Sequence, residues 1–315
     1  MNDHVLTSVL ERTTGRTPEE IIENPRFSIA RSRLLRAATL SMAGDEDTRL
    51  RQLINSLGRA ALFSVITGRY FRFAPDKRET WPTVKLVKER YLPLGFVRSR
   101  ALDETLGRLC TLGLVTMNPH PLDARTRLVM PSLSLLEFDR AWLADQFSSI
   151  EVLYPGCAAG AALRLGDIRY QLALRHLASH TTAQTQVTLN RIGPVRDAIL
   201  KQDGLRILTA YLLKADETGS RILNLPFSEV EQVISTSRTH VRHLFQTLEQ
   251  LGLVHLHRPG GQRLELTEML VEHIDRFLAT ILANYDVGWR AASWLVENEP
   301  SYAQYVPPAP ATEMI

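Results

Sequence analysis

RSRALDETLGRLCTLGLV (residues 98–115) and SRTHVRHLFQTLEQLGLV (residues 237–254) follow one pattern, and this internal repeat decides the fold. An offset of 139 residues aligns the two stretches without a gap, and both end in LGLV. Their apolar positions coincide in four pairs: Leu102 with Val241, Leu106 with Phe245, Leu109 with Leu248 and Leu112 with Leu251. This spacing predicts an amphipathic helix that ends at a left-handed glycine and is followed by an apolar strand. A duplicated segment of this kind predicts two copies of one supersecondary unit.

The composition of the chain is that of a globular protein long enough for two cores. It has 315 residues, of which 44% are hydrophobic and 23% are charged. An apolar run of about 18 residues does not occur, so we expect no transmembrane helix. The first residues lack the basic and apolar regions of a signal peptide. We expect Cys110 and Cys157 to be reduced thiols in a cytoplasmic protein.

The net charge of +3 hides a gradient along the chain. Residues 49–100 contain twelve Lys or Arg and three Asp or Glu, whereas residues 264–315 contain two Lys or Arg and eight Asp or Glu. Basic segments suit a polyanion and acidic segments avoid it. Any surface that binds nucleic acid should therefore exclude the C-terminal segment.

The elements around the repeat follow one order in both copies: helix, helix, helix, β-hairpin, helix. In the first copy we predict helices from Asp45 through Val65, over 81–91 and over 98–111, strands at 114–117 and 126–130, and a helix from Ser134. In the second copy, GLRIL (204–208) starts the first helix, strands lie at 254–257 and 262–266, and a helix follows from Thr267. The motif FDR (138–140) matches IDR (274–276) at an offset of 136.

This order predicts five segments. They are an N-terminal helical extension (1–45), a first domain (46–148), a helical joining region (149–193), a second domain (194–296) and a C-terminal tail (297–315). The extension contains a helix start at TPEEII (17–22), and the joining region contains a helix over 167–180 and a polar run over 181–188. The small-residue stretch GCAAGAA (156–162) lacks the spacing of a phosphate-binding loop.

Three helices closed by a hairpin form the winged helix, a helix-turn-helix variant. The third helix fits the DNA major groove, and the hairpin, or wing, reaches the backbone or the minor groove. We therefore expect a mainly α protein with small β-hairpin wings, made of two winged helix-turn-helix domains in tandem joined by a helical segment.

The second copy resembles bacterial winged-helix regulators in STSRTHVR (235–242). Hydroxyl groups at the helix start can cap it and donate to phosphates, and arginine can pair with guanine through two hydrogen bonds. The candidate DNA-binding residues of this helix are Thr236, Ser237, Arg238, Thr239, His240 and Arg242. In the second wing they are Arg258 and Arg263.

The first copy is similar to the MarR family of regulators in its wing, DARTRLVM (123–130). The resemblance implies that Arg125 reaches DNA and that Asp123 holds it in place. The family's Leu-Thr pair after the wing is replaced by Met130-Pro131 here but kept as Leu266-Thr267 in the second copy. The candidate DNA-binding residues of the first copy are Arg98, Ser99, Arg100, Arg125 and Arg127. Its third helix also carries Asp103 and Glu104, which predict either weaker binding or contacts to cytosine.

Catalytic and metal-binding patterns do not stand out. His240, His243, His255 and His257 lie close in sequence, but no carboxylate or thiolate accompanies them at ligand spacing. We expect no enzyme activity, no metal and no cofactor. The expected partner is double-stranded DNA, with any small-molecule effector unknown, bound by a monomeric pseudo-dimer or a homodimer in the nucleoid.

The expected function is that of a sequence-specific transcriptional regulator. Two alternatives remain open on the sequence: a plasmid replication initiator with tandem winged helices, and a winged-helix protein-interaction scaffold that does not bind DNA.

Overall fold

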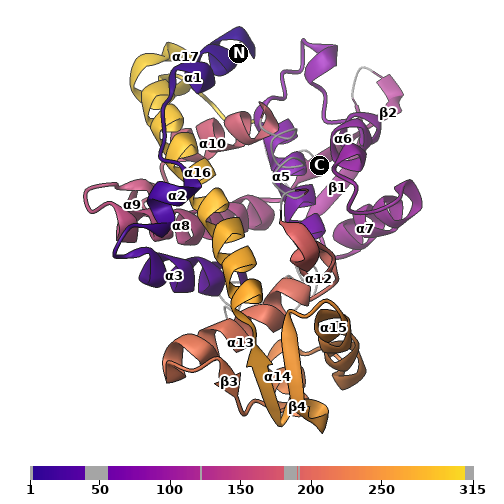
Figure 1. The fold of residues 1–315 in the computed structure, drawn as a ribbon. Coiled ribbons are helices and arrows are strands. Elements are labelled where there is room, and N and C mark those ends of the chain that lie inside the picture. The colour runs from indigo at the N-terminus through magenta and orange to yellow at the C-terminus, as the bar shows by residue number, and fades with distance from the viewer. Residues whose placement is uncertain (1–2, 40–55, 121–122, 181–189, 191, 309–315) are drawn as a thin grey trace.

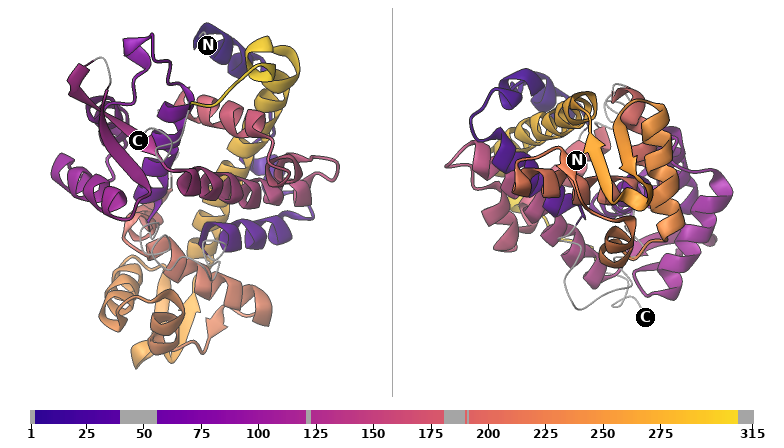
Figure 2. Two further views of the ribbon diagram at one scale, coloured as in Figure 1. Left: turned by 180° about the vertical axis from the view of Figure 1, so that it is seen from behind. Right: turned by 60° about the horizontal axis from the view of Figure 1, so that its bottom comes forward.

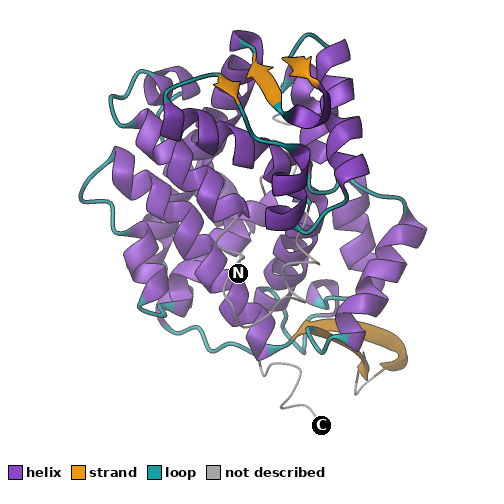
Figure 3. Cartoon of the chain, turned by 90° about the horizontal axis from the view of Figure 1, so that it is seen from below, coloured by secondary structure: helices purple, strands orange, loops and turns teal. Residues whose placement is uncertain are grey.

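The computed structural model describes residues 3–39, 56–120, 123–180, 190 and 192–308. Helices form most of this structure, and two small antiparallel sheets lie well apart on the helical body (Figures 1 and 3). The expectation of a mainly helical protein with small β-hairpins is confirmed. Among the described helices, none has the length and apolarity needed to cross a bilayer.

The first helical unit comprises residues 57–153. Its elements are α5 (Leu57–Phe71), the 3-10 turn η2 (Arg78–Thr80), α6 (Val84–Tyr91), η3 (Leu92–Leu94), α7 (Ser99–Thr111), β1 (Val115–His120), β2 (Asp123–Pro131) and α8 (Leu133–Leu153). Helix α6 starts three residues later than predicted, because the Thr83 hydroxyl caps it by accepting from the Leu86 backbone N–H. The predicted loop over 118–125 is instead largely strand, with a β-bulge between Pro119 and His120. The predicted helix start at Asp45 lies outside the described residues.

The second helical unit comprises residues 204–298. Its elements are α13 (Gly204–Thr218), β3 (Ile222–Leu223), α14 (Phe227–Ile234), α15 (Arg238–Gln250), β4 (Val254–Arg258), η5 (Pro259–Gly261), β5 (Arg263–Leu266) and α16 (Glu268–Asn298). The short strand β3 was not predicted, and it completes a sheet in the order β3-β5-β4. At this place the described part of the first unit has a single bridge, between Thr83 and Leu128.

The repeated helices bury the side chains that the sequence predicts. Six of them are at most 1% exposed: Leu102, Leu106 and Leu109 in α7, and Val241, Phe245 and Leu248 in α15. Gly113 and Gly252 follow these helices with φ of 69° and 68°, a conformation that favours glycine. The fourth predicted pair is not buried, because Leu112 and Leu251 are C-cap residues beyond the last helical turn.

The two helices that follow the hairpins align differently from the sequence motif. The hydroxyl groups of Ser132 and Thr267 cap α8 and α16, which sets an offset of 135 rather than 136. At this offset Leu135, Leu143, Ala144 and Phe147 align with Leu270, Leu278, Ala279 and Leu282, and all eight side chains are buried. Asp139 therefore takes the place of Ile274, not of Asp275, and points into the protein.

The N-terminal and joining segments are helical. They contain α1 (Asp3–Arg12), α2 (Pro18–Ile22), α3 (Phe27–Thr39), α9 (Ala159–Arg164), α10 (Ile168–His180), η4 (Gly193–Val195) and α12 (Arg196–Leu200), and α17 (Pro300–Ala303) follows α16. Thr17 and Glu20 form the capping box at the predicted start of α2. The predicted domain ends at 148 and 296 fall inside α8 and α16. The polar run over 181–188 lies outside the described residues.

The helices α3 and α10 cross between the two units. Helix α3 packs against α8 of the first unit and α13 of the second, and α10 packs against α5 of the first and α16 of the second. Each of them therefore contacts the first helix of one unit and the last helix of the other. Helices α8 and α16 also meet directly, where the Phe147 and Tyr285 rings stack at 4.7 Å.

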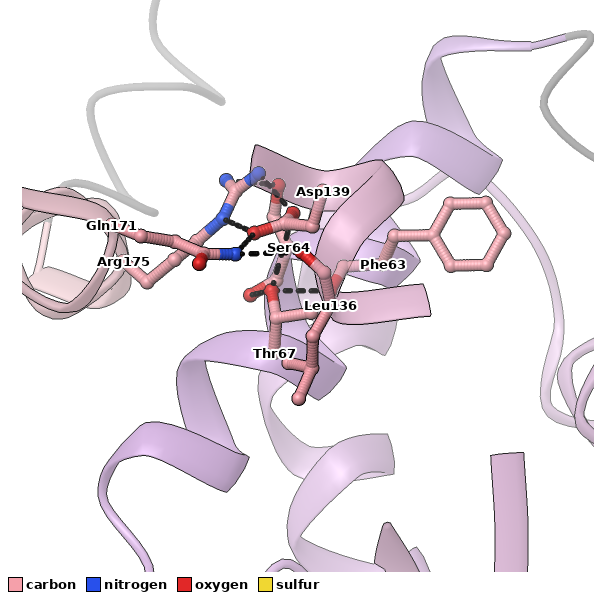
Figure 4. A network of polar contacts seen from close by, with 7 residues as sticks. All are labelled: Phe63, Ser64, Thr67, Leu136, Asp139, Gln171 and Arg175. Carbon is pink, nitrogen blue, oxygen red and sulfur yellow. Dashed lines mark hydrogen bonds and ion pairs between the residues drawn. The ribbon is translucent and has the colours of Figure 1, made fainter. Parts of the chain in front are cut away.

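A buried polar network joins α10 to the first unit (Figure 4). The Asp139 carboxylate of α8 accepts hydrogen bonds from the Arg175 guanidinium of α10, including one from Nε at 3.0 Å. It also accepts from the Gln171 amide at 2.9 Å. The Arg175 Nη1 donates to the Ser64 hydroxyl of α5 at 2.7 Å. One network thus connects three helices.

Candidate nucleic-acid interface

The exposed face of α15 is basic and begins at the N-terminal end of the helix. Val241, Leu244, Phe245 and Leu248 fill the core, so the positions on the opposite side of the helix face outward. Arg238, Thr239 and Arg242 are all exposed, as the sequence predicts. The N-terminal end of a helix carries partial positive charge, which adds to that of the two arginines.

The second hairpin brings further arginines to the same end of α15. A Cβ atom built on Gly260 would lie 3.2 Å from Nη2 of Arg238, so this guanidinium reaches the hairpin turn. Arg258 and Arg263 face each other across the strands next to this turn, and both are exposed. Three predicted arginines are therefore gathered where α15 meets the hairpin.

Three other predicted residues of the second unit already form hydrogen bonds within the protein. His240 turns back toward the chain before α13, with its Nε2 2.7 Å from the Gln202 carbonyl oxygen. The Ser237 hydroxyl caps α15 by accepting from the His240 backbone N–H at 3.2 Å. Thr236 is half-buried, and its backbone N–H donates to the Glu231 carbonyl. These residues shape the start of α15 more than they extend its exposed face.

In the first unit, α7 presents a basic first turn followed by carboxylates. Arg98, Ser99 and Arg100 are exposed, with Arg98 at the N-cap position. The carboxylates that follow are paired: Lys88 Nζ of α6 lies 2.7 Å from Asp103 Oδ1, and Arg100 Nε lies 3.2 Å from Glu104 Oε1. Neighbouring cations therefore neutralise Asp103 and Glu104, which lowers the repulsion that these carboxylates would exert on a phosphate.

The first hairpin forms one wall of an open hollow of about 670 Å³. Arg125 and Arg127 line it from β2, Lys85 from the first turn of α6, and Arg78 from η2. Glu79 and Glu89 also line it, which leaves a net excess of two positive charges. We name this hollow the basic hollow.

Asp123 organises the rim of the basic hollow. A hydrogen bond from the Thr126 hydroxyl, together with the Arg125 backbone N–H and the nearby Arg78 charge, lowers the pKa of this carboxyl. Its Oδ2 lies 3.0 Å from the Arg78 Nη2. Asp123 therefore fixes the Arg125 backbone and the Arg78 side chain, whereas the MarR resemblance implies that it holds Arg125 itself.

Arg78 and Lys85 are candidate residues that sequence reasoning missed. Both lie in the basic stretch 49–100, so the excess of Lys and Arg in that stretch was the sequence signal that could have identified them. Their proximity to the first hairpin depends on the packing of the 72–83 segment against β2, where the Val129 N–H donates to the Pro82 carbonyl at 2.7 Å. A linear pattern does not encode that contact.

Other kinds of site have little support in the described residues. No group of three or more His, Cys, Asp or Glu side chains there could hold a metal ion. On the second hairpin, His257 pairs with Glu265 at 2.9 Å, and His255 lies beside them. Burial raises the thiol pKa of Cys110 and of Cys157, which makes both poor nucleophiles at neutral pH.

Helices α7 and α15 lie along the same side, and the two hairpins project at opposite ends (Figures 1 and 2). Comparison with protein-family models, curated proteins and solved structures gave no significant match for this chain.

Proposed function

We propose that this chain is a bacterial transcriptional regulator that binds double-stranded DNA through two winged-helix units. The observation that carries the proposal is the placement of α7 and α15 along one side of a single chain, with arginine-bearing hairpins at the two ends. Third helices placed in this way would enter successive major grooves, about 34 Å apart or a multiple of it, while the hairpins follow the flanking backbone. Binding to chromosomal DNA would locate the protein at the nucleoid.

The crossed helices support a pseudo-dimer within one chain. In a two-fold dimer of DNA-binding proteins, contacts between subunits set the spacing of the two half-sites. Here α3 and α10 each join the first helix of one unit to the last helix of the other. One chain would therefore occupy both half-sites, and we expect one protein molecule per duplex in solution.

The decisive experiment is selection of bound duplexes from a random pool, followed by affinity measurements on the selected sequence and on a scrambled one. Arg238→Ala and Arg242→Ala should each weaken specific binding by about 1–3 kcal/mol. Arg33→Ala is the matched control, because Arg33 is an exposed arginine on α3, away from α7 and α15.

The outcomes separate the possible functions. Affinity should fall with salt at a logarithmic slope of about −0.9 for each phosphate contacted. Absence of any duplex binding would overturn the proposal and favour a protein-interaction scaffold. Genomic footprints confined to repeated origin sequences, rather than promoters, would instead identify a replication initiator.

A further inference from the structure

We infer that the two units make different contacts with DNA. The second unit recognises the base sequence through α15, and the first unit binds the phosphate backbone through the basic hollow. This inference rests on the proposed function and goes beyond it, because it assigns a different chemistry to each unit. The sequence already predicts a third helix in the first unit that binds more weakly or contacts cytosine, and the inference adds a separate phosphate-binding role for that unit.

The charges on the third helices differ between the units. Beyond its first turn, α7 presents Asp103 and Glu104, whose side chains are 50% and 65% exposed and whose charges are paired with Lys88 and Arg100. At the equivalent positions α15 presents Arg242 and His243, both exposed. Arginine is the side chain best suited to guanine, whereas carboxylates in ion pairs have lost much of their capacity to accept from cytosine. Base reading is therefore concentrated in α15.

The charges on the second helices differ in the opposite direction. The first turn of α6 carries Lys85, which is 87% exposed on the basic hollow and whose Nζ lies 3.8 Å from Glu89 Oε1. The first turn of α14 carries Glu229, which is exposed and would repel a phosphate. A phosphate contact beside the third helix is thus favoured in the first unit and opposed in the second.

The segment before α6 explains why the basic hollow belongs to the first unit. Between α5 and α6 the chain makes an excursion over residues 72–83 that carries Arg78 to the hairpin, where Asp123 holds it. Between α13 and α14 the second unit has the shorter segment 219–226, which contains β3. Four cations from η2, α6 and β2 therefore converge on one hollow whose other wall includes the apolar side chains of Val84 and Leu86. Such a surface fits a sugar-phosphate backbone, which presents charge and apolar sugar together.

The test compares a hollow variant with a reader variant on the same duplexes. Lys85→Ala/Arg127→Ala removes two exposed cations of the hollow, and Arg242→Ala removes one cation of α15. The hollow variant should bind the selected and the scrambled duplex more weakly by the same factor, and its salt slope should become shallower by about two units. The reader variant should lower the ratio of specific to scrambled affinity by about 5- to 150-fold. Arg33→Ala should change neither quantity.

The selected sequences give a second, independent readout. Selection with the wild-type chain should return one half-site with a strong base preference beside a half-site with little base preference. Arg242→Ala should weaken the base preference of the first half-site. Two half-sites of equal information would overturn the inference while leaving DNA binding intact. A hollow variant that loses discrimination at an unchanged salt slope would overturn it too. If the wild-type chain binds no duplex at all, the proposed function itself fails.

Discussion

Replacing Asp139 by Asn should destabilise the protein far more than the same change at Asp275. The side chains of Asp139 and Arg175 are 1% and 4% exposed, so the Asn variant would leave a buried guanidinium without its counter-ion. Removing one partner of such a pair costs about 3–5 kcal/mol. With an unfolding entropy of about 2.1 cal/mol/K per residue, 315 residues give about 0.66 kcal/mol/K, so the Tm should fall by about 5–8 °C.

Two variants make this stability measurement specific. Asp139→Leu/Arg175→Met removes both charges, and the side chains around them keep other partners: Gln171 still donates to the Leu136 carbonyl and Thr67 to the Phe63 carbonyl. The half-buried Ser64 hydroxyl loses its Arg175 donor. The Tm of this double variant should still lie close to that of the wild type, because apolar replacement of a buried ion pair is often neutral. Asp275→Asn affects a carboxylate that is 23% exposed and should lower the Tm by about 2 °C or less.

The assay is thermal unfolding at neutral pH, monitored by circular dichroism. If Asp139→Asn melts within about 2 °C of the wild type, the pair does not hold α10 against α5 and α8 as argued. A double variant that melts as low as the single one would show that packing, and not the unpaired charge, sets the cost.

Two further predictions concern single positions. Burial, with Asp216 nearby, raises the pKa of Asp275 more than Arg31 lowers it, so the folded chain keeps this proton to a higher pH than the unfolded chain. Acidification from pH 7 to about pH 4 should therefore favour the wild type over Asp275→Asn, and a constant difference in Tm across this range would contradict the assignment. Gly261→Ala should destabilise the second hairpin by roughly 1–3 kcal/mol, because φ is +74° and the new Cβ would lie 2.4 Å from Phe227 Cδ1. Gly107→Ala is its control: no described atom outside the local helix lies within 4 Å of a Cβ there, and alanine favours the helix, so a loss of stability would refute the argument.

The sequence was sufficient where local chemistry determines structure. The stripe of Val241, Phe245 and Leu248 fixed the buried face of α15, and Gly252 marked its end. The Thr17 capping box and the second hairpin also followed from short-range patterns. Predictions were less accurate where the boundaries of an element depend on its tertiary neighbours. Strand β3 contains two residues and exists because β5 lies beside it. A two-residue strand leaves no periodicity to detect.

The candidate site was less predictable because its charges act through tertiary neighbours. Asp103 looks repulsive in sequence, but Lys88 from another helix neutralises it. His240 looks available, yet its ring meets a carbonyl 38 residues away. The crossing of α3 and α10 had no sequence signal, since an amphipathic helix does not specify which of two similar units it will cover.

Fusion of the two units in one chain permits an asymmetry that a homodimer cannot have. In a homodimer, any substitution that turns a reader into a backbone clamp alters both half-sites at once. In this chain, α7 and α15 are encoded separately, so Asp103 can occupy one unit while Arg242 occupies the other. The crossed helices pack against both units. Under the proposed function, the second contact with DNA would therefore occur at high effective concentration. Weak, sequence-independent binding of the phosphate backbone by the first unit would then raise the affinity of the second without adding to its sequence requirement.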